Sequence, residues 1–294
     1  MIFDGSRIMA LDIPGKDVSS ALSEKIRQKV KLLEEKGITP TLRTIRAGDN
    51  PGDLSYERGA AKRCAALGIA VQNLAFPADV SREELYAAVC EANEDPSVHG
   101  VLMFRPLPAH LDQDEIGNAL LPQKDVDGMT DLSMSGVFTG KEVGYPPCTA
   151  QACMEILDYC GIDLSGKRAV VIGRSNVIGR PVSMLLLRRH ATVTVCHTRT
   201  VDLAAEARRA DILVAAAGRP GMIGADFVRP GQVILDVGIN VDENGRLCGD
   251  VDYEAVKETV SRITPVPGGV GAVTTTVLAA HVADAALRQN RGRW

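Results

Sequence analysis

Four short apolar runs in the second half of the chain constrain its fold most strongly. They read RAVVIG, ATVTVCH, DILVAAAG and QVILDVG, beginning at residues 168, 191, 211 and 232, and their apolar residues are consecutive rather than alternating. Strands of this kind are buried on both faces of a parallel sheet, and parallel strands need crossover connections, which are usually helices. The second half is therefore predicted to be an α/β domain of dinucleotide-binding character.

The first half of the chain also alternates between helical and extended patterns. Apolar residues recur at helical spacing over 17–36, and Gly37 follows where a helix would stop. This alternation again indicates parallel β–α units. We expect strands at 41–48, 69–76 and 99–105, helices at 54–67 and 81–93, a loop-like segment at 124–133, and a helix over 274–287.

The chain has 294 residues, a length at which two domains are expected. The predicted fold class is α/β, with an N-terminal parallel-sheet domain and a Rossmann-like NAD(P)-binding domain. Tyr145-Pro146-Pro147 marks the expected junction. We place the first domain at residues 1–145 together with the C-terminal helix 274–294, and the second at 146–273.

Composition excludes several classes of partner. The net charge is −4 and no long basic block is present, which argues against nucleic acid and anionic membranes. No stretch approaches the roughly 18 to 20 apolar residues that span a bilayer, and the N-terminus, with Asp4, does not resemble a targeting signal. The seven cysteines form no CxxC pair, so we expect neither a disulfide framework nor a metal site, and we predict a reducing cytoplasm.

The turn after the first of the four strands resembles a phosphate-binding loop. It reads GRSNVIGRP, with Gly173 at the strand end, Gly179 six residues later and Pro181 near the helix start. This differs from GxGxxG, but glycine permits the tight turn and free N–H groups at a helix N-terminus bind phosphate. Taken alone, the loop is equally compatible with an ordinary strand-to-helix turn.

The end of the next strand indicates which nucleotide is bound. An NAD site usually places an acidic residue there, to bind the ribose hydroxyls, whereas residues 196–200 read CHTRT. Arg174 and Arg199 are positioned to flank a 2′-phosphate, so we predict NADP rather than NAD. The alternative is that both arginines are simply solvated.

Longer motifs extend over most of the chain and together carry a family resemblance. The sequence resembles the bifunctional methylenetetrahydrofolate dehydrogenase/methenyltetrahydrofolate cyclohydrolases of the FolD type. The motifs are GDNPGDLSY (48–56), RPLPAHL (105–111), KDVDG (124–128), PCT (147–149), VVIGRSNVIGRP (170–181), TVCHTRT (194–200), DVGIN (236–240), GDV (249–251) and TPVPGGVGAVT (264–274).

The resemblance implies a folate domain completed by the C-terminal helix, a Rossmann-like NADP domain, an active cleft between them and a homodimer. Tyr56 is then expected to stack on the folate, and Asp127 to bind the pterin; we assign both as catalytic and substrate-binding. Their alternatives are a half-buried aromatic residue and a loop-forming aspartate. Further expected substrate contacts are Pro106, Gly268 and Val270, and expected cofactor contacts are Gly173, Arg174, Ser175, Thr198, Arg199, Ile239, Gly269 and Gly271.

Two positions depart from the family pattern where hydrolysis is carried out. The family has a lysine four residues after the tyrosine and a glutamine before the PLP motif, whereas this chain has Ala60 and Phe104. Lys62 is a poor replacement, because six residues along a helix turn it about 240° away from Tyr56. Proline is also replaced, by Ala150 and Ala272, which affects loop stiffness more than chemistry.

These departures favour one of the family's two reactions. Hydride transfer from 5,10-methylenetetrahydrofolate to NADP+ mainly requires the two rings to be held in register, whereas hydrolysis of the methenyl product requires proton transfer. We therefore expect a dehydrogenase with weak or absent cyclohydrolase activity. The alternatives are full bifunctionality with Arg58, Lys62 or Arg105 as a replacement group, action on a modified one-carbon carrier, and a paralog that binds nucleotide or folate without turnover.

The remaining reactive side chains carry weaker signals. Cys148, Cys153 and Cys160 lack matching histidines, and we interpret them as packing residues. His197 lies at a strand end near the expected cofactor site, where it either contacts the nucleotide or has a structural role.

Overall fold

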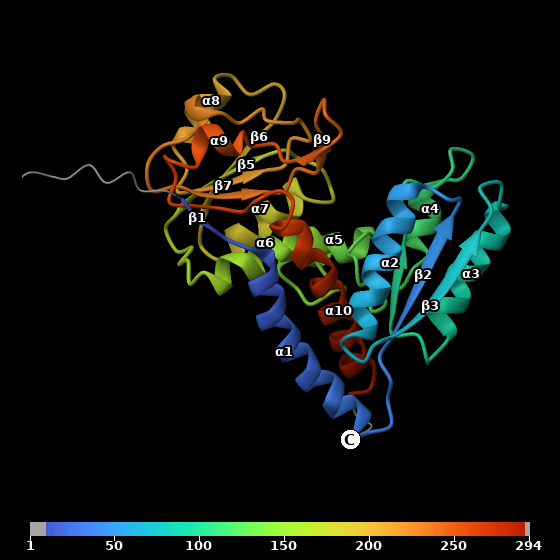
Figure 1. The fold of residues 1–294 in the computed structure, drawn as a ribbon. Helices are drawn as coiled ribbons and strands as arrows, with labels where there is room; N and C mark the ends of the chain where they lie inside the picture. Colours follow the sequence, from blue (N-terminus) through green and yellow to red (C-terminus); the bar gives the residue numbers. More distant parts are fainter. Residues whose placement is uncertain (1–9, 292–294) are drawn as a thin grey trace, which may run out of the picture. The chain divides into compact units, whose positions relative to one another are not determined.

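The computed structural model describes residues 10–291, which separate into two compact units (Figure 1). Of the described residues, the nucleotide unit comprises 10–18 together with Thr149–Thr274, and the folate unit comprises Ser19–Cys148 together with 275–291. These names follow the sequence predictions. The boundaries fall inside the first and last long helices, so each helix contributes to both units.

The nucleotide unit is built on a six-stranded sheet in the order β1-β11-β8-β7-β5-β6, in which every pairing is parallel. Helices α7 and α8 follow β5 and β6 and pack on opposite faces of the sheet (Figure 1). The elements are β1 (Leu11–Asp12), α6 (Cys148–Tyr159), β5 (Arg168–Ile172), α7 (Gly179–Arg188), β6 (Thr192–Cys196), α8 (Leu203–Arg208), β7 (Ile212–Ala215), η1 (Ala225–Phe227), β8 (Val233–Asp236), β9 (Asn240–Val241), β10 (Leu247–Cys248), α9 (Tyr253–Val256) and β11 (Arg262–Ile263).

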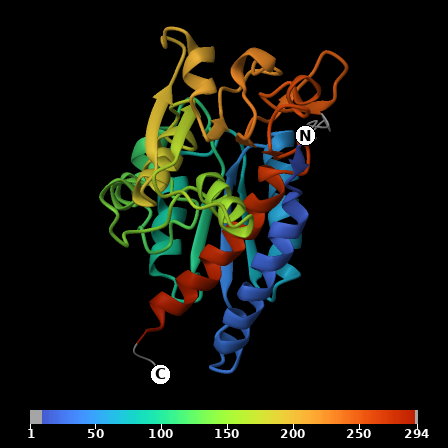
Figure 2. The same cartoon turned by 90° about the vertical axis from the view of Figure 1, so that its left-hand side faces the viewer.

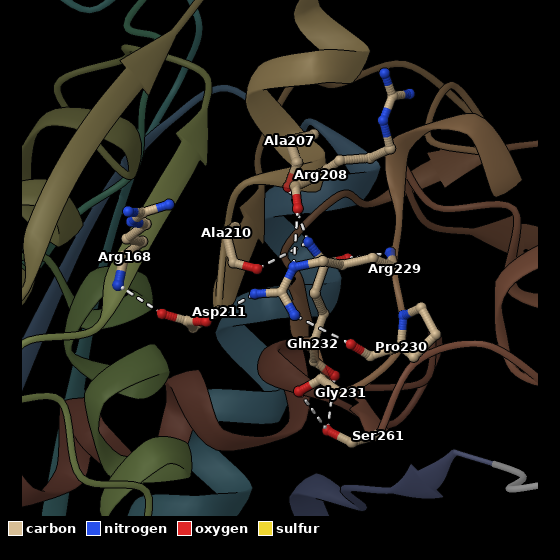
Figure 3. Close-up of polar contacts among 10 residues, drawn as sticks. All are labelled: Arg168, Ala207, Arg208, Ala210, Asp211, Arg229, Pro230, Gly231, Gln232 and Ser261. Carbon is tan, nitrogen blue, oxygen red and sulfur yellow. Dashed lines mark hydrogen bonds and ion pairs between the residues drawn. The ribbon is translucent and has the colours of Figure 1, made fainter.

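A polar network joins the amino ends of four of these strands (Figure 3). Asp211 accepts a hydrogen bond from the backbone N–H of Arg168 at 2.9 Å and pairs with the Arg229 guanidinium at 2.7 Å. The side-chain amide of Gln232 donates to the carbonyls of Ala207 and Ala210, and Ser261 donates to the carbonyl of Gln232. These contacts stabilise the amino edge of the sheet. The loops that are expected to bind ligands follow the carboxyl ends of the strands, at the opposite edge.

The folate unit contains a three-stranded parallel sheet in the order β3-β2-β4. The central strand β2 is buried along almost its whole length, with α2 on one face and α3 on the other (Figure 1). The elements are α1 (Gly15–Glu34), β2 (Thr41–Ala47), α2 (Pro51–Ala65), β3 (Ala70–Phe76), α3 (Arg82–Glu94), β4 (Gly100–Met103), α4 (Gln113–Asn118), α5 (Asp131–Thr139) and α10 (Val270–Gln289).

Helix α10 runs beside α1 in both views (Figures 1 and 2) and is tied to it by Lys29 and Asp284, 2.6 Å apart. Its Val282 lies against Gly100 of β4, where there is no room for a larger residue. The expectation that no stretch is long and apolar enough to span a bilayer is wrong for α10 by length and composition. However, 72% of its apolar window is buried inside the structure, as in the core helix of a globular protein.

The predicted α/β class with parallel sheets is confirmed. The structure differs from the expected elements chiefly in three places. Leu11–Asp12 pairs with β11 in the sheet of the nucleotide unit, whereas we had placed residues 1–145 in the first domain. Helix α10 begins at Val270 rather than 274, because the glycine-rich turn ends earlier than its composition indicates. Part of the 124–133 loop also belongs to α5, which begins at Asp131.

Replacing Gly249 with alanine should destabilise the nucleotide unit. A Cβ at this position would lie 1.8 Å from Oδ2 of Asp236, whose buried carboxylate has no space to move. Overpacking of this kind lowers the free energy of unfolding by about 1–3 kcal/mol. The matched control is Gly224→Ala, where the added Cβ would have no neighbour within 4 Å. Urea denaturation of both variants measures the difference, and equal stabilities would contradict the packing described here.

Candidate active site

Two glycines shape the loop after β5 because neither site has room for a Cβ. Gly173 has a positive φ of 126°, and a Cβ there would lie 2.1 Å from the carbonyl oxygen of Ala216 at the end of β7. A Cβ on Gly179, the first residue of α7, would lie 2.2 Å from the carbonyl oxygen of Gly173. The chain therefore turns tightly from strand to helix, as a phosphate-binding loop requires.

The tip of this loop is open to solvent. Arg174 and Ser175 are exposed, and Oγ of Ser175 accepts a hydrogen bond from the N–H of Ile178 at 3.1 Å. In the part of the chain that the structure describes, no side chain caps the N-terminus of α7. The N–H of Arg180 bonds to the carbonyl of Ser175 at 3.0 Å, and Pro181 has no N–H, so the N–H of Gly179 and the two exposed polar side chains are the groups that fit a nucleotide phosphate.

The turn after β6 carries Thr198 and Arg199, both exposed. Nδ1 of His197 accepts a hydrogen bond from the N–H of Arg199 at 3.1 Å, and Thr200 Oγ1 accepts one from the N–H of His197 at 2.9 Å. His197 thus stabilises the turn, which supports the structural interpretation of this histidine. The turn presents a guanidinium and no carboxylate, which suits a 2′-phosphate.

A third group of predicted residues follows β8 and β11. Ile239 is 70% exposed, and a Cβ on Gly271 would lie 3.6 Å from its Cδ1, so these two positions are neighbours. Gly268 has a φ of 103°, and its carbonyl accepts a hydrogen bond from the N–H of Gly15 at 2.8 Å. A Cβ on Gly15 would lie 2.1 Å from the carbonyl oxygen of Gly269. Sequence reasoning missed Gly15, whose role depends on a contact distant along the chain.

Two buried carboxylates organise the same edge of the sheet, and sequence reasoning assigned neither a role. Asp250 accepts hydrogen bonds from the consecutive N–H groups of Ala217, Gly218 and Arg219 at 2.5–3.0 Å. Asp236 accepts from the N–H groups of Gly238, Asp250 and Val251 at 3.0 Å. Burial raises the pKa of Asp236 to about 6, although these hydrogen bonds oppose the shift. Both acids lie in the DVGIN and GDV motifs, which were the available signal.

In the folate unit, α2 presents Tyr56 beside two apolar neighbours. The Tyr56 and Phe104 rings meet edge to face with their centroids 6.2 Å apart. Ala60, one turn further along the helix, is completely buried. Burial, with a smaller contribution from the charge of Asp127, raises the pKa of Tyr56 well above its ordinary value. The phenol is therefore neutral near physiological pH.

Asp127 lies two residues after Asp125, which pairs with Val101 of β4. Its side chain is 24% exposed, and Arg105 lies 3.9 Å from Oδ2. Burial raises the pKa of Asp127 to about 6, while Arg105 and a hydrogen bond from the backbone N–H of Cys148 oppose the rise. The carboxylate is thus mostly ionised at neutral pH and becomes protonated as the pH falls through about 6.

A buried histidine, His281, lies next to the Cys148 thiol. The Cys148 thiol donates to the carbonyl of Val126 at 3.2 Å and lies 3.7 Å from Nδ1 of His281, which is itself 2.8 Å from the same carbonyl. The His281 ring packs on Tyr145, with centroids 5.0 Å apart. Burial lowers the pKa of His281 to about 4, so the ring is neutral. Cys148 thus acts as a buried support for the Asp127 loop.

The structure separates the predicted residues by unit. Tyr56, Asp127 and the exposed Pro106 belong to the folate unit, while Gly268, Val270 and every predicted cofactor contact belong to the nucleotide unit. Arg58 and Lys62 are exposed, and only Arg105 of the three suggested replacements contacts Asp127. Residues 10–291 contain no cluster of three His, Cys, Asp or Glu side chains that is placed to hold a metal ion.

Comparison with known families decides what this arrangement belongs to. The model of the tetrahydrofolate dehydrogenase/cyclohydrolase catalytic domain matches residues 13–127, and the model of the same family's NAD(P)-binding domain matches residues 147–290. The chain belongs to the tetrahydrofolate dehydrogenase/cyclohydrolase family. The predicted resemblance, enzyme class and nicotinamide nucleotide cofactor are thereby confirmed.

Relatives of this family member cover nearly its full length. The bifunctional protein FolD of Clostridioides difficile is 49% identical over 278 residues, which are 95% of this chain and 97% of the relative. The crystal structure of the Campylobacter jejuni bifunctional enzyme FolD has a TM-score of 0.92 at 39% identity, covering 95% and 99% of the two chains.

A third relative was solved with its cofactor. The Trypanosoma brucei methylenetetrahydrofolate dehydrogenase-cyclohydrolase, complexed with NADP and an inhibitor, has a TM-score of 0.91 at 35% identity, covering 97% and 99%. The roles of individual residues in this family member, and the replacement of the family lysine and glutamine by Ala60 and Phe104, stay predictions.

Folate binding by this family member should weaken as the pH falls through about 6. The carboxyl of Asp127 has a pKa of about 6 and is expected to accept the pterin N–H groups when it is ionised above that pH, whereas the protonated form loses acceptor capacity. Calorimetric titration with tetrahydrofolate from about pH 5 to about pH 8 measures the effect. Asp127→Asn should bind weakly with a flatter pH profile, and the exposed Asp114→Asn should retain the wild-type profile. An unchanged profile in Asp127→Asn would contradict this role.

Proposed function

We propose that the protein catalyses NADP-dependent oxidation of 5,10-methylenetetrahydrofolate to 5,10-methenyltetrahydrofolate, with weak or absent cyclohydrolase activity. One observation carries the second half of the proposal: the residue one helical turn after Tyr56 is a completely buried alanine, and the ring of Phe104 packs against Tyr56 where the family has an amide. The pocket wall beside Tyr56 therefore offers a methyl group and an aromatic edge instead of an amine and an amide.

The dehydrogenase reaction asks mainly for position. Tyr56 would stack on the pterin, and the Asp127 carboxylate would accept its N–H groups, fixing the ring plane. Three features of the nucleotide unit fit NADP. Gly173 and Gly179 allow the backbone to turn tightly, no side chain caps the N-terminus of α7, and the guanidiniums of Arg174 and Arg199 are exposed. Bound NADP+ supplies the hydride acceptor, and these residues would hold its phosphates.

Hydrolysis requires proton transfer in addition. A side chain positioned as a general acid or base typically raises the reaction rate by about 10²- to 10⁴-fold. The groups beside Tyr56 supply little of it. The phenol of Tyr56 is neutral, and a guanidinium such as that of Arg105 does not lose its proton in proteins. Lys62 and Arg58 are exposed on α2.

Full bifunctionality is the second candidate, and two observations favour it. The C. difficile relative, at 49% identity, is called a bifunctional protein. Asp127, with a pKa of about 6, also lies in the range of a general base. In that case the carboxylate would have to bind the pterin and take a proton in the same cycle.

A paired assay separates the two candidates. Purified protein receives methylenetetrahydrofolate with NADP+ or NAD+, and the formation of reduced nucleotide and of the methenyl product are followed together. We expect NADP-dependent oxidation and a methenyl product that decays no faster than in buffer. Rapid enzyme-dependent decay would establish bifunctionality, and binding of NADP without any turnover would indicate a non-catalytic paralog. Turnover that tetrahydrofolate does not inhibit would indicate a modified carrier.

Restoring the family residues provides a second test of the same assignment. Ala60→Lys combined with Phe104→Gln should raise the enzyme-dependent decay of the methenyl product by about 10²-fold, because both polar groups return beside Tyr56. Phe104→Gln alone is the matched control and should have a smaller effect. Thermal unfolding of each variant verifies that the lysine is accommodated at the buried position.

The choice of nucleotide is tested separately. Arg174→Ala and Arg199→Ala should each raise the KM for NADP+ by about tenfold while leaving the KM for NAD+ nearly unchanged, because charge-assisted hydrogen bonds to the 2′-phosphate are lost. Arg188→Ala, an exposed arginine at the end of α7, is the matched control. Equal effects on both nucleotides would contradict the assignment. We further propose that the protein acts as a cytoplasmic homodimer, which sedimentation and fractionation would test.

A further inference from the structure

The central strand of the folate unit carries charged residues where apolar ones are expected. Strand β2 reads TLRTIRA and is paired on both sides, yet Arg43 and Arg46 are 9% and 8% exposed. Buried arginines are rare unless paired, because removing a guanidinium from water is costly. Each of these two arginines has carboxylate partners, and the two sets of partners lie on opposite faces of the sheet.

Arg46 faces α2 and contacts three residues near the N-terminus of that helix. Its guanidinium donates to the carbonyl of Gly48, pairs with Asp49 at 2.6 Å and contacts Glu57 at 3.3 Å. Glu57 also lies 2.6 Å from the hydroxyl of Thr44, two residues earlier on the same face of β2. Gly48 and Asp49 precede α2, and Glu57 belongs to its second turn. The contacts therefore bracket Tyr56 on both sides.

The buried stripe of α2 makes this anchor important. It consists of Glu57, Ala60 and Cys64, so the helix docks through a carboxylate and two small residues. Two small side chains bury little apolar area, and the large apolar residues of the first two turns, Leu54 and Tyr56, are only half-buried. The orientation of these turns thus depends on the contacts of Glu57 with Arg46 and Thr44.

We propose that Arg46 and Glu57 form a buried clamp that positions Tyr56 for folate binding. Both are positioning residues, since neither is placed to contact the folate itself. The choice of a reduced folate as ligand rests on the proposed function. The clamp would hold Tyr56 in a fixed orientation although its neighbour one turn later, Ala60, is small. Its removal should raise the KM for methylenetetrahydrofolate while leaving the KM for NADP+ unchanged.

The same strand offers a matched control. Arg43 is equally buried and pairs with Asp95 at 2.8 Å and with Gln72, but it faces α3 and lies about 10 Å from Arg46 along the strand. Arg46→Met and Arg43→Met therefore remove similar charges from one strand. A merely structural role predicts similar kinetics for both variants. The clamp predicts that Arg46→Met raises the folate KM about tenfold or more, whereas Arg43→Met changes it by less than about twofold.

A second pair of variants separates position from stability. Arg46→Met leaves the buried carboxylate of Glu57 without its guanidinium partner, so this variant alone should lower the melting temperature. Glu57→Gln should lower it less, because Arg46 still pairs with Asp49. Arg46→Leu combined with Glu57→Val restores an apolar contact and should melt near the wild-type temperature, yet it should still show the raised folate KM. Arg46→Lys should recover part of the loss. Wild-type folate KM in the double variant would overturn the proposal.

Hydrogen exchange provides a readout that does not depend on activity. In the absence of ligands, backbone amides of residues 48–57 should exchange faster in the double variant than in the wild type, and should be unaffected in Arg43→Met. This measurement reports on the clamp even if the wild type fails to oxidise methylenetetrahydrofolate, an outcome that would refute the proposed function instead. Unchanged exchange at these amides in the double variant would show that Arg46 and Glu57 do not hold Tyr56.

Discussion

Parallel strand pairing decides where this protein can place reactive side chains. In a parallel sheet all carboxyl ends meet at one edge, and the loops that follow them are brought together without help from the rest of the chain. In the nucleotide unit, β5, β6 and β8 end at Ile172, Cys196 and Asp236. The predicted cofactor residues from Gly173 to Ile239 follow within three residues of these ends, and Gly269 and Gly271 come after β11. In the folate unit, the chain after β2 leads into α2 and Tyr56, and the chain after β4 leads through Phe104 to Arg105.

The two units stabilise buried carboxylates at this edge by different means. Asp236 and Asp250 accept backbone N–H groups from the loops themselves, so the donors are held by the main chain and no long side chain has to be ordered. Glu57 instead relies on a guanidinium and a hydroxyl from β2. The first arrangement shapes a loop, because the carboxylate and the loop cannot move separately. The second connects a strand to a helix across the sheet.

Sequence reasoning predicted the strands well because continuous apolar runs report burial on both faces, and this burial is local in the sequence. It placed α10 four residues late, because Val270 and Gly271 are poor helix formers that tertiary context overrides. It missed β1, which consists of two residues and gains its identity only from pairing with β11.

The charges of the folate unit were harder to predict for a different reason. The sequence analysis assigned Arg43 and Arg46 no role, because their carboxylate partners lie on other elements that only the fold places beside them. The pKa of Asp127 likewise depends on Arg105 and Cys148, which only the fold brings to it. Motifs identified the candidate residues, but the environment that sets their chemistry lies in contacts between segments.

If the proposed roles of Tyr56 and Asp127 hold, the family's two reactions would compete for a single carboxylate. The phenol is neutral, a guanidinium such as that of Arg105 only donates hydrogen bonds, and Asp127, beside the tyrosine, has a pKa of about 6. A carboxylate that accepts the pterin N–H groups is most useful when ionised and stationary, whereas a general base must give up that ionised form in each cycle. With a lysine at position 60 these duties would fall on two side chains. Under the proposed function, with Ala60 at this position, they would fall on Asp127 alone, and a single carboxylate serves more readily the duty that requires only a fixed geometry.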